Sequence, residues 1–175
     1  MERVYVPATE IKMLEDENDT DHFVVEGLGA AFGNIDRVDD IIEKGAFRKT
    51  LVNRKTNIKM LFNHNSDDLM GVWTTAIERE DGLFVKGIMH KEDPLAQRMK
   101  RLIDMGALDS MSIGFRVKDY IIDDGIRVIK EMDLHEVSLV PFPANEEAAI
   151  MGVKSVDDVQ TWTKKDIEEL SLIHI

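Results

Sequence analysis

The chain has 175 residues, 43% of them hydrophobic and 32% charged, a composition typical of one globular domain with enough apolar residues for a core. Its formal net charge of −12 argues against a nucleic acid or an anionic membrane as partner, because phosphate groups require a basic surface. The absence of cysteine excludes disulfides, thiolate catalysis and cysteine zinc sites. No apolar run has membrane-spanning length and the first residues lack a signal-peptide core, so we expect no membrane segment and no secretion.

The first half of the chain is predicted to consist mainly of strands. Segment 22–34 ("HFVVEGLGAAFGN") reads as extended, and its glycines, with no helix directly after them, indicate bulges in a curved strand rather than a nucleotide site. A loop at 34–40 and a short helix at 45–54 follow. The pattern then predicts a strand that ends at His64 and a β-hairpin over 71–90.

The second half contains the clearest helix, at 93–106, where Asp93 is a good N-cap and Gly106 occupies the C-terminal glycine position. A strand beginning "LDSMSIGF", a turn at 122–125 and a strand at 126–142 come next, followed by a polar linker and a helix from Thr161. Strands dominate this order. We therefore predict an α+β fold, with a small antiparallel, barrel-like β-sheet, closed or nearly closed, flanked by a few helices.

The strand beginning "LDSMSIGF" has an unusually small polar face. Side chains alternate along a strand, so one face is apolar and the other consists of Ser110, Ser112, Gly114 and Arg116. A solvent face usually carries Lys, Glu, Thr and Arg. Two hydroxyl groups and a glycine instead indicate that another group comes close to this strand.

Two other polar residues stand out beside apolar strands. His64 follows a strand and precedes a polar turn, which is typical of a surface loop residue but is also where sites are commonly built. Glu136 lies on the same face of its strand as Leu134 and Val140. Its carboxylate must therefore be desolvated and requires a cationic or hydrogen-bonding partner. That partner is either a structural Arg or Lys or a functional group. His135 points to the other face, as an ordinary strand histidine would.

One chemistry would connect these features. A serine hydroxyl becomes a useful nucleophile when a nearby base, usually histidine, removes its proton. A carboxylate then holds the imidazole in one tautomer. Ser112, His64 and Glu136 lie on three separate strands or strand ends, and the sequence does not show whether they meet. No H-E-x-x-H motif occurs, so we predict no zinc site, no other metal and no cofactor.

Four sequence blocks, in this order, resemble the prohead (capsid maturation) proteases of tailed bacteriophages, which are related in fold to herpesvirus assemblins. They are "N-x-D…GAF" within 34–47, "FNH…MG" around His64, "MSIGF" at 111–115 and "HEVSLVPFPAN" around Glu136. The resemblance implies an assemblin-like sheet and a serine endopeptidase. Such an enzyme removes a scaffold protein, or a scaffold-like segment of the major capsid protein, and often cleaves itself.

The resemblance also assigns roles to residues. The family's nucleophile matches Ser112 rather than Ser110, its histidine matches His64, and its acidic third member matches Glu136, with His135 as the alternative. Oxyanion donors are expected at the turn 141–145 or near Gly114, which would also leave room for substrate. The implied location is the assembling procapsid in the host cytoplasm, and a homodimer is the assembly that the family suggests.

The resemblance divides the chain into a protease domain at 1–152 and a linker with a helical tail at 153–175. Relatives continue into a further helical tail, whereas "SLIHI" ends this chain, which is the pattern of either a truncated gene product or a processed form. Two other functions remain open from the sequence. The first is a non-catalytic capsid-assembly module on the same fold, and the second is an unrelated small-molecule-binding β-barrel.

Overall fold

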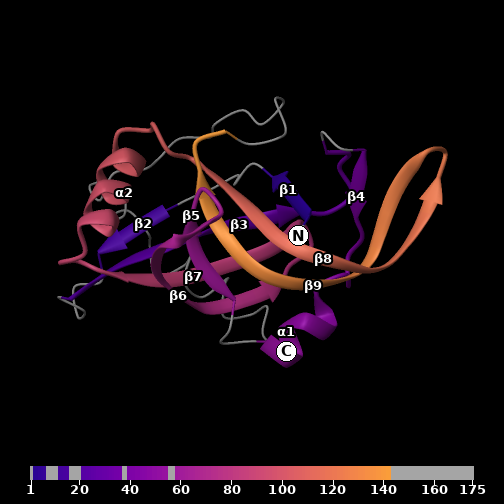
Figure 1. Cartoon of the computed structure of the whole chain (residues 1–175), viewed down its shortest axis with the longest axis horizontal. Helices are drawn as coiled ribbons and strands as arrows, with labels where there is room; N and C mark the ends of the chain where they lie inside the picture. The colour runs from indigo at the N-terminus through magenta and orange to yellow at the C-terminus, as the bar shows by residue number, and fades with distance from the viewer. Residues whose placement is uncertain (1, 7–11, 16–20, 37–38, 55–57, 143–175) are drawn as a thin grey trace, which may run out of the picture.

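A curled β-sheet with two helices at its periphery forms the part of the chain that the computed structural model describes, residues 2–6, 12–15, 21–36, 39–54 and 58–142 (Figure 1). The helices are α1 (Arg48–Arg54) and α2 (Pro94–Asp104). The strands are β1 (Glu2–Val6), β2 (Lys12–Glu15), β3 (His22–Ala31), β4 (Asp40–Ile42), β5 (Lys59–Phe62), β6 (Asn65–Glu78), β7 (Gly82–His90), β8 (Ser110–Asp123) and β9 (Ile126–Val140).

The strands follow the order β1-β8-β9-β5-β6-β7-β3-β2, and β4 pairs with β9 beside this path. The backbone of β3 also lies close to β8 and β1, so the two ends of the sheet approach each other as in a half-barrel. The prediction of an α+β fold with a curled sheet and few helices is confirmed at this level. Most pairs are antiparallel, as predicted.

The prediction of an antiparallel sheet is wrong at two pairs, since β4 and β5 both run parallel to β9. A period-two pattern identifies a strand but carries no information about which strand pairs with it or in which direction. The short strand β4 was also not predicted, because two isoleucines after the predicted loop are too short a run to show a period-two pattern.

The "GAF" block fixes the entry to α1. The Glu78 carboxylate, at the end of β6, accepts hydrogen bonds from the backbone N–H groups of Gly45 (3.1 Å) and Phe47 (2.9 Å). Phe47 itself is fully buried in the core. A carboxylate that binds otherwise unsatisfied N–H groups ahead of a helix stabilises its start, so this block ties α1 to the sheet.

Helix α2 confirms the local signals read from the sequence. The Asp93 carboxylate accepts hydrogen bonds from the N–H groups of Leu95 (2.7 Å) and Ala96 (3.4 Å). Gly106 has the left-handed φ of 74° expected of a C-terminal glycine. The helix packs against the core through three buried side chains, those of Ala96, Met99 and Ile103.

The hairpins and the glycine-rich strand also agree with prediction, with shifted boundaries. The pairing of β3 with β7 shifts between Leu28 and Ala30, which confirms a bulge in the glycine-rich segment. The 71–90 hairpin is present as β6 and β7, although β6 begins earlier, at Asn65. The predicted linker, the helix from Thr161 and the tail at 153–175 lie outside the described residues.

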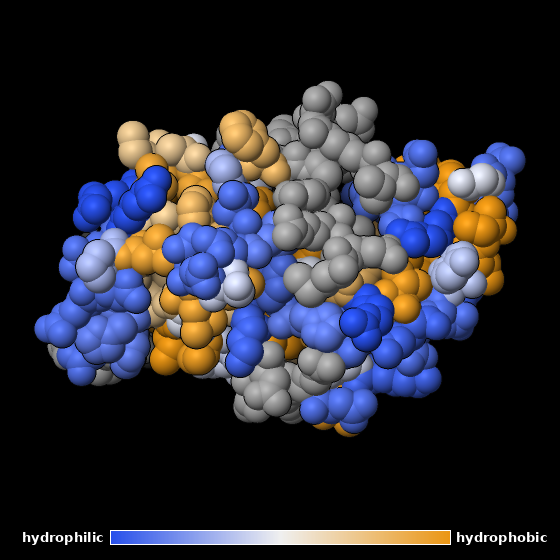
Figure 2. Space-filling view, in the orientation of Figure 1, coloured by the Kyte–Doolittle hydropathy of each residue, from blue (hydrophilic) through white to orange (hydrophobic). Residues whose placement is uncertain are grey.

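The outer part of the β8–β9 hairpin, residues 116–133, forms an arm beyond the residues that pair with β1, and the short strand β4 pairs with the β9 side of this arm (Figure 1, orange). Hydrophobic residues reach the surface at the end of the molecule where this arm lies (Figure 2). The large exposed apolar side chains of the arm are those of Tyr120, Ile121 and Ile122. No helix among the described residues has the length and apolar character needed to cross a membrane.

Candidate active site

His64 lies in the tight turn that connects β5 to β6. Phe62 pairs with Asn65, so Asn63 and His64 are the two central residues of a two-residue hairpin loop. Both have left-handed φ values, 52° and 59°, which is the backbone signature of a type I′ turn. The predicted position of His64 is the end of a strand, but the residue occupies a turn position that usually favours glycine, at a cost of about 1–2 kcal/mol.

The pairing of β8 with β9 places the predicted serine and carboxylate on one face. Ser112 is the cross-strand partner of Ser138, and Gly114 is the partner of Glu136. Side chains of directly paired residues project from the same side of a sheet. Strand β5, which runs parallel to β9, ends beside these residues, because its last residue, Phe62, pairs with Leu139.

These three elements bring the three predicted site residues together. Ser112 Oγ lies 2.8 Å from His64 Nε2. On the other side of the imidazole, His64 Nδ1 forms a hydrogen bond with Glu136 Oε1. Since Nδ1 faces a carboxylate, it carries the proton, and Nε2 presents its lone pair to the Ser112 hydroxyl.

All three residues are buried. The exposed fractions are 0% for Ser112, 2% for Glu136 and 8% for His64. In such surroundings hydrogen bonds between polar groups are stronger than in water, and an unpartnered carboxylate is costly. The buried Glu136 predicted from its apolar neighbours is therefore present, and its partner is the histidine rather than an Arg or Lys.

Gly114 makes room for the carboxylate. A Cβ atom at this position would lie 2.2 Å from Glu136 Oε1 and 2.8 Å from Glu136 Cδ. Both distances are shorter than the contacts that Cβ atoms make in proteins. The predicted role of this glycine is to leave space for substrate. The structure fills the space with the side chain of Glu136 instead.

His135 is the alternative to Glu136, and Ser110 is the alternative to Ser112; each has an aspartate beside it. His135 Nε2 is 3.7 Å from Asp133 Oδ2, and the carboxylate on His64 is that of Glu136. The Ser110 hydroxyl donates a 2.7 Å hydrogen bond to its neighbour Asp109. The turn expected to supply oxyanion donors continues beyond Phe142, outside the described residues.

Ser138 also belongs to the site, although it was not among the predicted site residues. Its hydroxyl donates to Glu136 Oε2 (2.5 Å) and accepts a 3.2 Å hydrogen bond from the backbone N–H of His64. The available signal was the alternation that places Ser138 on the same face as Glu136. That signal could not reveal contact with His64, which lies 74 positions earlier in the chain.

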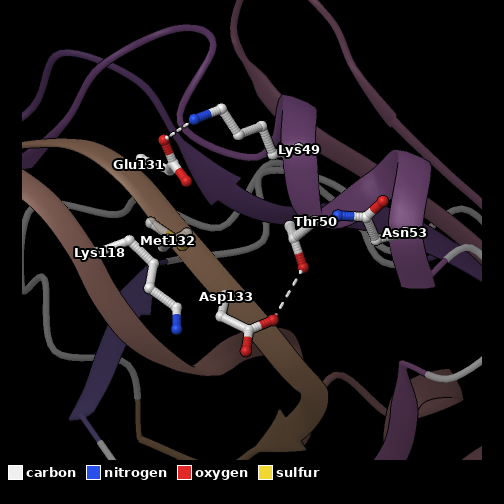
Figure 3. Close-up of a pocket in the computed structure, with 7 residues that line it drawn as sticks. All are labelled: Lys49, Thr50, Asn53, Lys118, Glu131, Met132 and Asp133. Carbon is white, nitrogen blue, oxygen red and sulfur yellow. Dashed lines mark hydrogen bonds and ion pairs between the residues drawn. The ribbon is translucent and has the colours of Figure 1, made fainter.

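A separate hollow of about 410 Å³ lies between α1 and the arm strands (Figure 3). In it the Thr50 hydroxyl lies 3.5 Å from Asp133 Oδ1 and accepts a hydrogen bond from the N–H of Leu134. None of the three candidate catalytic residues lines it. Its lining residues are Lys49, Thr50, Asn53, Lys118, Glu131, Met132 and Asp133.

Within the described ranges, no group of three or more His, Asp or Glu residues is arranged to hold a metal ion.

A serine hydroxyl, an imidazole and a carboxylate linked in this order form the arrangement found in serine hydrolases. Comparison with known proteins gives the particular family. Residues 9–164 match the family described as the caudovirus prohead serine protease. The chain belongs to this family of phage capsid maturation proteases, which confirms the resemblance read from the four sequence blocks.

Individual relatives agree with this assignment. The chain is 38% identical over 164 residues to the prohead protease of Enterobacteria phage HK97, covering 91% of this chain and 71% of the relative. It is 30% identical over 161 residues to the prohead protease of Escherichia phage T5, covering 88% and 75%. A third relative, the capsid polyprotein of Pseudomonas phage PAJU2, is 32% identical over 86% of this chain but only 22% of its own length.

A solved structure shares the fold. The bacteriophage T4 capsid assembly protease superposes with a TM-score of 0.62, covering 79% of this chain and 95% of that chain. The sequences are 11% identical, so this likeness concerns the fold alone.

Proposed function

We propose that this protein is a serine endopeptidase in which Ser112 is the nucleophile, His64 the general base and Glu136 the residue that orients His64. The observation that carries the proposal is the continuous hydrogen-bonded line from Ser112 Oγ through the imidazole to Glu136 Oε1. Membership of the prohead serine protease family supports the same chemistry.

The reaction would be acyl transfer to serine. His64 Nε2 accepts the proton as Ser112 Oγ attacks the scissile carbonyl, and the same nitrogen returns that proton to the leaving amine. Glu136 keeps the Nδ1 proton in place and stabilises the imidazolium that forms. Water then attacks the acyl-serine, with His64 again as base, and releases the new carboxyl terminus. Because Ser112 is fully buried, a local rearrangement must uncover Oγ before a substrate carbonyl can reach it.

The proposed substrate is a scaffold protein or a scaffold-like segment of the major capsid protein, cleaved inside the assembling procapsid in the host cytoplasm. One relative carries its matching region within a protein named a capsid polyprotein, which supports a link to capsid proteins. Self-cleavage and a homodimer are further parts of this proposal. The net charge of −12 suits a protein substrate better than a nucleic acid.

The test is co-expression with the neighbouring capsid and scaffold genes, followed by mass spectrometry of new chain termini. We expect Ser112→Ala to slow cleavage by on the order of 10³-fold or more, and a serine-directed phosphonate to modify Ser112 in the folded wild type. Undiminished cleavage by Ser112→Ala would refute the assignment. A folded wild type that neither cleaves nor reacts would indicate a non-catalytic assembly module.

A further inference from the structure

The Ser138 hydroxyl contacts two groups that position the His64 imidazole. One is the Glu136 carboxylate, and the other is the backbone of the turn that carries His64. Ser138 is fully buried and is the direct cross-strand partner of Ser112. Its hydroxyl group can donate one hydrogen bond and accept others. The structure uses both capacities, toward Glu136 Oε2 and from the His64 N–H.

The carboxylate is held at two points as a result. Glu136 Oε1 bonds to His64 Nδ1 and Oε2 bonds to the Ser138 hydroxyl. Two contacts on two oxygens fix the rotation of the carboxylate plane, whereas a single contact would leave it free to turn. The direction in which Oε1 meets the imidazole therefore depends on Ser138.

The hydrogen bond from the His64 N–H to Ser138 restrains the turn that carries the imidazole. His64 has a left-handed φ of 59°, a backbone conformation that is unfavourable for a residue with a side chain. Such a conformation persists only where the surroundings hold it. The His64 N–H bond to Ser138 is one such restraint, and the bond from the Asn63 N–H to the Leu139 carbonyl oxygen (2.9 Å) is another.

We propose that Ser138 is a positioning residue of the active site, which fixes the imidazole of His64 against Ser112 by holding the Glu136 carboxylate and the His64 backbone with one hydroxyl group. This inference rests on the proposed catalytic roles of Ser112, His64 and Glu136. Ser138 itself is not the nucleophile, because it is Ser112 Oγ that lies 2.8 Å from Nε2.

Covalent labelling of Ser112 by a serine-directed phosphonate measures the effect without knowledge of the natural substrate. We expect Ser138→Ala to lower the labelling rate by about 10- to 100-fold, the effect of losing a hydrogen bond to a charged group. Ser110→Ala is the matched control, since it removes another buried serine hydroxyl, one bonded to Asp109. Its labelling rate should stay within about twofold of wild type.

A second pair of variants protects the test against loss of folding. Ser138→Thr and Ser138→Val have side chains of nearly the same shape and differ in the hydroxyl group. We expect Ser138→Thr to be labelled about tenfold faster than Ser138→Val or more. Equal rates in this pair, or a wild-type rate in Ser138→Ala, would overturn the inference.

NMR of ¹⁵N-histidine-labelled protein separates positioning from general stability. In wild type we expect a His64 Nδ1–H signal bonded to the carboxylate, and in Ser138→Ala that signal should shift or broaden through exchange. An unchanged signal together with a labelling loss that follows the unfolded fraction would indicate a merely structural role. A wild type that is never labelled would refute the proposed function, and the His64 signal would still decide whether Ser138 positions the imidazole.

Discussion

Gly114→Ala tests whether the missing side chain at this position is what admits the Glu136 carboxylate. The added Cβ would lie 2.2 Å from Oε1 and 2.8 Å from both Cδ and Cγ of Glu136. To restore an ordinary contact of 3.4 Å, Oε1 must move by about 1.2 Å. The backbone of β8 cannot easily retreat, because it is paired on both sides, with β1 and with β9.

A displacement of this size should affect both activity and stability. Misplacing a catalytic group by about 1 Å can cost about 10²-fold in rate, so we expect at least that loss in the rate of Ser112 labelling and in substrate cleavage. Glu136 is 2% exposed, and breaking a buried ionic or hydrogen-bonded pair costs about 3–5 kcal/mol. We therefore expect the free energy of unfolding to fall by about 3 kcal/mol.

Urea denaturation measures the stability, and phosphonate labelling below the unfolding transition measures the activity. Gly29→Ala is the control, because Gly29 is also buried but a Cβ there meets only the Val137 Cγ1 atom at 3.2 Å and other atoms beyond 3.6 Å. It should keep its labelling rate within about threefold of wild type. A Gly114→Ala protein that is as active and as stable as Gly29→Ala would refute the reasoning.

Three further substitutions test single contacts. Glu136→Gln should fold but lose about 10³- to 10⁴-fold in cleavage rate, since an amide at this position can hold the wrong imidazole tautomer; a smaller loss than tenfold in the co-expression assay would contradict this. Glu78→Ala should lower the free energy of unfolding by about 1–3 kcal/mol, because the N–H groups of Gly45 and Phe47 lose their acceptor. Asp93→Ala should lower it by about 1 kcal/mol through loss of the α2 N-cap. Urea titrations check both, and no change in the midpoint would count against the described contacts.

The elements predicted correctly are those whose causes are local. Helix α2 depends on an N-cap at Asp93, an apolar stripe and a glycine at position 106, all within one short segment. The hairpins depend on turn residues between alternating runs. Strand β4 and the parallel pairing of β5 with β9 depend on segments far apart in the sequence, and no local pattern encodes them.

The candidate site divides in the same way. The sequence by itself determined the chemistry available, namely a serine on a small polar face, a histidine beside a strand and a carboxylate among apolar residues, because each of these follows from local alternation. Only the tertiary structure decided that Glu136 rather than His135 meets His64, that Gly114 makes room for that carboxylate, and that Ser138 joins the site. These outcomes depend on the register between β8 and β9 and on the turn after β5, which are fixed by packing across distant strands.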